Sequence, residues 1–197
     1  MNTQKETYDI IESFIQNTAS ERLPRKSATT VHRSEPTDTS IDLSYEHWIS
    51  SIMVASNAVK IQFVVHYTPE AASWFRCGDS SLTADNVRLA HDHIREFCNL
   101  TAGAIKRGLQ NLCSTENKPI ELMVTLPDQE PSSEFVADYT LAKEKENQHC
   151  HVFKIHCDDF ALVCASTINI LDWKMANEIS EDNIELPPAD EFDIEFL

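Results

Sequence analysis

The chain has 197 residues, of which 42% are hydrophobic and 24% are charged, and its net charge of −16 comes from 16 basic and 32 acidic residues. Such a charge opposes binding to nucleic acid and to anionic membranes, and no apolar run approaches the roughly 18 residues of a membrane-spanning helix. The N-terminus does not resemble a secretory signal, so the six cysteines are expected to be reduced thiols in a cytoplasmic protein.

The first third of the chain predicts a helix, a linker, a hairpin and a second helix. Apolar residues at helical spacing indicate an amphipathic helix over residues 3–19, and the polar segment 21–40 is typical of a mobile linker. Two β-rich runs within 47–67, on either side of Ser56-Asn57, predict a hairpin. Thr68 as N-cap and Pro69 in the first turn then begin a short helix.

A long helix should follow from Thr83 to about Leu112. Its buried side is predicted to consist of Val87, Ala90, Ile94, Phe97, Thr101, Ile105 and Leu112. The opposite side carries Asp92, Glu96, Asn99 and Gly103, which helical geometry places within an arc of about 60°. Glycine inside a helix costs about 1 kcal/mol relative to alanine, so Gly103 favours a flat place where another backbone approaches. We call these four residues the α-helical stripe and expect it to face solvent or a partner.

The remaining sequence favours strands. We expect one strand at 119–127, a weaker one at 134–142, and two within 150–171 that turn at Asp158-Asp159. Neighbouring strands predict an α+β fold, a mainly antiparallel sheet packed with one long central helix and shorter helices. The domain organisation is then 1–45, an N-terminal helix and polar linker; 46–173, the folded domain; and 174–197, an acidic tail.

Two other constellations are weighed against the stripe. His149, His151 and His156, with the neighbouring cysteines, could bind a metal, but strand alternation divides them between two faces of a sheet. Cys98 could act as a nucleophile, but its position turns it toward the buried flank of the helix, where thiols are inert. His91 and His93 could make the stripe sensitive to pH, although a plain exposed role is the simpler interpretation.

The segment EFCNLTAGAIKRGL, residues 96–109, resembles the central-helix signature of the CheX/CheC chemotaxis phosphatases. That signature has Ser or Asp four residues before a Glu and an Asn three residues after it, often followed by Met-Thr-Ala-Gly. Asp92, Glu96 and Asn99 match these positions, and Leu100 replaces the Met before Thr-Ala-Gly. The resemblance extends more loosely from about 48 to 171, and the single signature is similar to the one-site CheX type.

The resemblance implies a phosphatase for the aspartyl phosphate of a CheY-like response regulator. Glu96 would pair with the regulator's active-site lysine, Asn99 would orient the attacking water, and Asp92 would support binding at the edge of the contact. No cofactor is expected on this chain, since magnesium would be held by the regulator, and a homodimer is expected. The alternative is a non-enzymatic adaptor that binds a regulator or a flagellar motor component through the same face.

Overall fold

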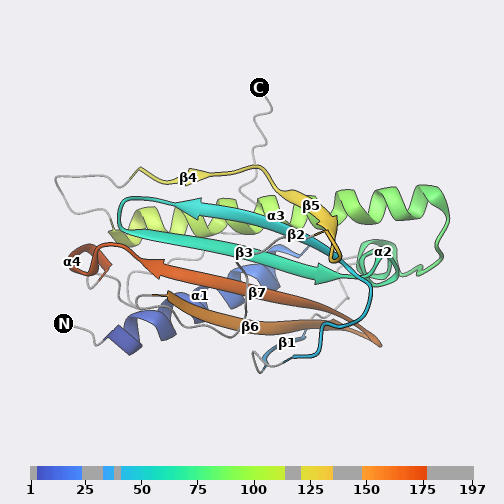
Figure 1. The fold of residues 1–197 in the computed structure, drawn as a ribbon, viewed down its shortest axis with the longest axis horizontal. Helices are drawn as coiled ribbons and strands as arrows, with labels where there is room; N and C mark the ends of the chain where they lie inside the picture. The colour runs from blue at the N-terminus through green and yellow to red at the C-terminus, as the bar shows by residue number, and fades with distance from the viewer. Residues whose placement is uncertain (1–3, 24–32, 38–40, 114–120, 135–147, 177–197) are drawn as a thin grey trace.

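The computed structural model describes residues 4–23, 33–37, 41–113, 121–134 and 148–176, and it confirms an α+β fold (Figure 1). The helices and strands in chain order are α1 Gln4–Arg22, β1 Arg33–Pro36, β2 Trp48–Ala55, β3 Val59–Tyr67, α2 Pro69–Cys77, α3 Ala84–Cys113, β4 Met123–Val124, β5 Asp128–Pro131, β6 Gln148–Cys157, β7 Phe160–Ile170 and α4 Trp173–Ala176. The strands form one antiparallel sheet in the order β1-β6-β7-β3-β2-β4, with β5 also paired to β2.

Two hairpins form the centre of the sheet, and both were predicted. β2 and β3 pair from Trp48 opposite Tyr67 to Ala55 opposite Lys60, around the expected turn. β6 and β7 turn at Asp158, which has a φ of 55° and so adopts the left-handed conformation that Asp tolerates better than most residues. Because β3 pairs with β7, the two hairpins join into a continuous sheet.

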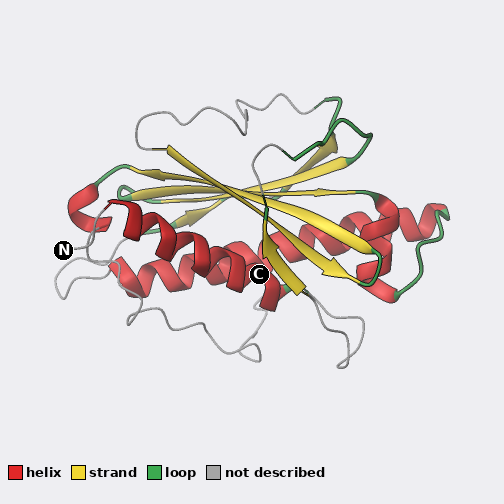
Figure 2. Ribbon diagram, turned by 90° about the horizontal axis from the view of Figure 1, so that it is seen from below, coloured by secondary structure: helices red, strands yellow, loops and turns green. Residues whose placement is uncertain are grey.

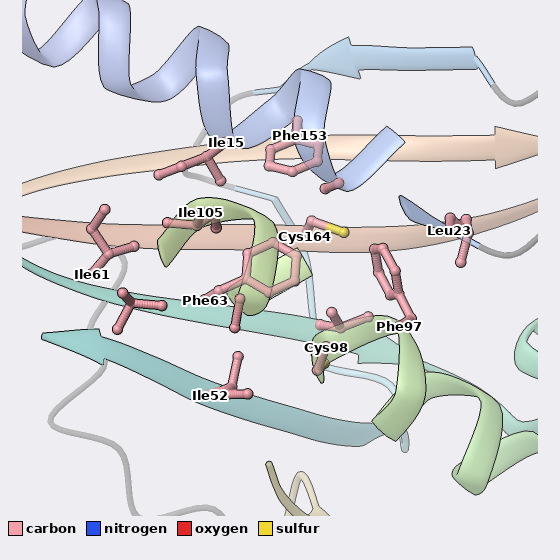
Figure 3. Packing of buried hydrophobic residues seen from close by; sticks show 14 of the residues in the cluster. Ile15, Leu23, Ile52, Ile61, Phe63, Phe97, Cys98, Ile105, Phe153 and Cys164 are labelled. Carbon is pink, nitrogen blue, oxygen red and sulfur yellow. The ribbon is translucent and has the colours of Figure 1, made fainter. Parts of the chain in front are cut away.

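The helices gather on one face of this sheet, where they enclose the main core (Figure 2). Apolar side chains of α1, α2 and α3 pack against the apolar side chains on the inner face of the strands. Helical and strand periodicity place these side chains on one side of each element. Phe97 of α3 meets Phe63 of β3 edge to face, with ring centroids 5.9 Å apart (Figure 3). This packing holds α3 along the sheet and fixes which of its sides is left outside.

A glycine allows α1 to approach α3 closely. Phe14 of α1 is buried, and a Cβ added to Gly108 of α3 would overlap its ring. α1 also contributes Ile10, Ile11 and Ile15 to the main core, so the N-terminal helix packs with the strands and helices that follow it.

Several elements differ from the sequence prediction. Arg33–Pro36, inside the expected mobile linker, forms β1 and pairs with β6, because backbone hydrogen bonding at a sheet edge does not require apolar side chains. Within the described residues 121–127, the strand expected at 119–127 is limited to the two residues of β4, and β5 was not predicted. The weak strand at 134–142 falls almost entirely outside the described residues, as do residues 177–197 of the tail. In the described ranges, no helix is both long and apolar enough to span a membrane.

Candidate functional site

The α-helical stripe lies on the outer side of α3, as predicted. Asp92, Glu96 and Asn99 are exposed, and Gly103 is partly exposed with open space where a Cβ would stand. The stripe runs from Asp92 to Gly103, which at 1.5 Å per residue is about 16 Å of helix. A partner surface could therefore lie against it over about three turns.

The opposite side of α3 explains why the stripe faces outward. Thr83 caps the helix, since its Oγ1 accepts from the backbone N–H of Asn86 at 3.2 Å. Side chains along the inner face are completely buried against the sheet and the other helices. They are Ala90, Ile94, Phe97, Cys98, Thr101, Ala102, Ile105 and Leu109. Rotation of α3 would remove these side chains from the core, so the stripe is presented on a rigid element.

The stripe residues differ in what they contact. Asp92 is ion-paired on both carboxylate oxygens, with Arg95 Nη1 at 3.1 Å and Arg88 Nη1 at 3.4 Å. Glu96 and Asn99, in contrast, have no hydrogen-bond or ion-pair partner in the part of the chain that the structure describes. A free carboxylate and a free amide are thus available to an incoming molecule, while Asp92 is engaged by its own helix.

A polar network connects the first half of the stripe to the sheet. Gln129 of β5 accepts from Arg95 Nη2 at 2.9 Å, and its Nε2 donates to the His91 carbonyl at 2.9 Å and to the Tyr67 hydroxyl at 3.0 Å. The Tyr67 hydroxyl lies 2.7 Å from His91 Nδ1, and the Trp48 ring lies 4.3 Å from the His91 ring by centroids.

The network corrects the interpretation of His91 as a plain exposed residue. Its ring is partly buried, and burial, followed by the nearby Arg95 charge, lowers the pKa of His91. Because Gln129 donates to Tyr67, the tyrosine proton is free to go to Nδ1 of a neutral His91. Sequence reasoning missed Gln129 because β5 is a short edge strand with no apolar pattern to reveal it.

The Cys98 nucleophile is not supported. Cys98 is completely buried, its thiol donates to Ser50 Oγ at 3.4 Å, and burial raises its pKa to about 12. A thiol in this state is neither ionised near neutral pH nor accessible to a substrate.

The metal hypothesis is also not supported. His149 and His151 share a face of β6, as alternation predicted, and both contact Glu12 of α1; His151 Nδ1 lies 3.3 Å from Glu12 Oε2. His156 lies on the other face, 3.1 Å from Glu35 of β1. Among the described residues no cluster of three or more His, Cys, Asp or Glu side chains is arranged to hold a metal ion.

The fold and the site together define an α+β protein in which a long helix packs along an antiparallel sheet and exposes a carboxylate and an amide on its outer side. No family model matches the sequence, and no curated protein matches it. Solved structures do match. FliY from Thermotoga maritima has a TM-score of 0.51 and 13% identity, over 90% of this chain and 98% of that one.

Two further structures show the same architecture. The FliM middle domain from H. pylori has a TM-score of 0.51 and 10% identity, over 90% of this chain and all of that one. The chemotaxis protein CheX from Vibrio vulnificus has a TM-score of 0.50 and 9% identity, over 83% of this chain and 99% of that one. At these identities the comparison shows a shared fold. It confirms the CheX/CheC-like fold that the signature helix implied.

Proposed function

We propose that this protein hydrolyses the aspartyl phosphate of a CheY-like response regulator. The observation that supports the proposal is the state of the stripe: Glu96 and Asn99 are exposed on a rigid helix, without partners in the described part of the chain, beside the open surface at Gly103. This arrangement suits a helix that docks against another protein and inserts two side chains into its site.

The chemistry needs little more than positioning. Water attacks phosphorus in line, the bond from phosphorus to the aspartyl oxygen breaks, and inorganic phosphate and a free carboxylate result. Asn99 is suited to orient this water, because an amide donates one hydrogen bond while accepting another. Glu96 supplies a carboxylate for a lysine of the regulator, and the regulator would hold the magnesium ion, so this chain needs no cofactor of its own.

We further propose that the protein is a homodimer that pairs through an edge of its sheet. β4 forms one edge, and the apolar side chains in and beside it are exposed, with Met123 at 70% and Leu126 at 88%. Exposed edge strands of this kind readily pair with a second copy.

The alternative function is an adaptor that binds a regulator or a flagellar motor component without hydrolysis. The observation that favours it is that the fold is shared with the FliM middle domain and FliY as well as with CheX.

One experiment tests the choice between the two. The experiment measures the release of labelled phosphate from the phosphorylated CheY-type regulators of the source organism, with and without this protein. Faster release supports the phosphatase. Binding without faster release supports the adaptor, and neither binding nor release contradicts both.

A further inference from the structure

The outer side of α3 differs in charge from the rest of the chain. The chain has a net charge of −16, with twice as many acidic as basic residues. Over its whole length, however, α3 carries four basic side chains, Arg88, Arg95, Lys106 and Arg107, against three acidic ones, Asp85 in its first turn, Asp92 and Glu96. Since Asp92 is already paired with two of these arginines, Glu96 is the acid of the α-helical stripe that remains free. The proposed docking side is therefore locally positive on a strongly acidic protein.

Arg95 is held in place by contacts from two elements. Its Nη1 donates to Asp92 at 3.1 Å and its Nη2 donates to Gln129 at 2.9 Å, so contacts from two elements fix the plane of the guanidinium. Gln129 is fixed in turn by the His91 carbonyl and the Tyr67 hydroxyl. A guanidinium has five N–H donors, of which these bonds use two, and the side chain is 47% exposed. Arg95 therefore keeps free donors in a preorganised position.

The position of Arg95 relates it directly to Asn99. The two residues are four apart on one helix, so they are neighbours on its surface, with Cβ atoms about 6 Å apart. Arg88 lies seven residues before Arg95 on nearly the same side and adds to the positive potential. Strand alternation keeps the β5 acids Asp128 and Glu130 on the opposite face of the sheet from Gln129, away from this group.

We propose that Arg95 is a partner-binding residue that contacts the carboxylates surrounding the phosphorylation site of the regulator, while Asp92 and Gln129 are its positioning residues. This inference rests on the proposed function. A site that holds an aspartyl phosphate and Mg²⁺ needs oxygen ligands, chiefly carboxylates, so its rim is acidic. Arginine fits carboxylates through paired N–H donors, which lysine cannot reproduce. Asp92 then acts through Arg95 and not by touching the partner.

The test compares Arg95→Gln with Arg33→Gln, an exposed arginine on β1 at the far edge of the sheet that matches the change in charge. The probes are the CheY-type regulators of the source organism, with Mg²⁺, both unmodified and activated with beryllofluoride. Arg95→Gln should raise Kd about tenfold for both forms, the size typical of losing an interface arginine. It should also raise KM while kcat changes less than about threefold, and it should flatten the dependence of Kd on salt. Arg33→Gln should behave as the wild type.

Two further variants separate positioning from folding. Arg95→Lys keeps the positive charge but loses the paired N–H donors of the guanidinium, so its affinity for the regulator should lie between those of Arg95→Gln and the wild type. Gln129→Ala alone should raise KM. In a protein that already carries Arg95→Gln, it should raise KM little further, since both substitutions act through the same guanidinium. A purely structural role of Gln129 would instead make the two effects additive.

The outcomes distinguish this inference from the proposed function. If the wild type hydrolyses the phosphate and Arg95→Gln binds normally, the role of Arg95 is wrong and the phosphatase stands. If affinity falls only for the activated form, Arg95 contacts the phosphoryl group and the inference is overturned. If the wild type binds without hydrolysis and Arg95→Gln weakens binding, the role of Arg95 holds and the phosphatase falls. If the wild type binds no regulator, both fall.

Discussion

Asn99 offers the sharpest test, because its loss should affect activity and stability in opposite directions. Its side chain is exposed and makes no hydrogen bond within the described part of the chain, so Asn99→Ala removes no side-chain hydrogen bond from that part of the fold. Alanine is also the better helix former, so we expect stability to be unchanged or to rise by up to about 0.7 kcal/mol. Loss of one catalytic positioning group costs about 10²-fold in rate, which is about 2.7 kcal/mol of activation free energy.

The assay measures release of labelled phosphate from the phosphorylated regulator, alongside thermal melting and binding of each variant. Asn57→Ala is the matched control, because Asn57 is also exposed and without a partner in the described residues but lies in the turn between β2 and β3. We expect Asn99→Ala to bind normally and lose about 10²-fold in rate, and Asn57→Ala to keep the full rate. A melting temperature well below wild type would make Asn99 structural, and a normal rate in a folded variant would refute its catalytic role.

Three other predictions follow from the packing. Gly103→Ala should stabilise the protein by up to about 1 kcal/mol, because alanine has the higher helix propensity and its Cβ would stand in open space. Gly108→Ala should destabilise the protein by about 1–3 kcal/mol, because its Cβ would overlap the Phe14 ring. Unfolding in urea measures both changes, and equal changes would contradict this packing. Burial, with a smaller effect of His47, lowers the pKa of His66 to about 4. As the pH falls, the unfolded chain therefore binds a proton at this histidine before the folded chain does. About 3 kcal/mol of folding free energy, present above pH 6.5, should be lost between pH 6.5 and 4. His66→Gln should flatten this dependence, and an unchanged slope would exclude His66 as its source. Light scattering should show a dimer, and a 22.4 kDa monomer at all micromolar concentrations would disprove sheet-edge pairing.

Periodicity in the sequence was sufficient to predict the main elements and the orientation of α3. The sides of this helix differ strongly: Ile94, Phe97 and Ile105 are buried on one side, and Glu96 and Asn99 are exposed on the other. A helix with such a contrast has only one favourable rotation against a sheet, so residue spacing alone identifies its exposed face. The central hairpins were predictable for a similar reason, since they combine β-branched runs with local turns.

The edges of the sheet and the contacts of the site could not be obtained in this way. β1 and β5 have little apolar content. They form because their backbones hydrogen-bond to β6 and β2, strands that come from distant parts of the chain. The partners of Arg95 depend on the same effect, since Gln129 is 34 residues away and reaches the helix only once β5 has paired with β2. Local spacing identifies which residues share a face of one element, whereas contacts between elements form only when long-range pairing has closed the fold.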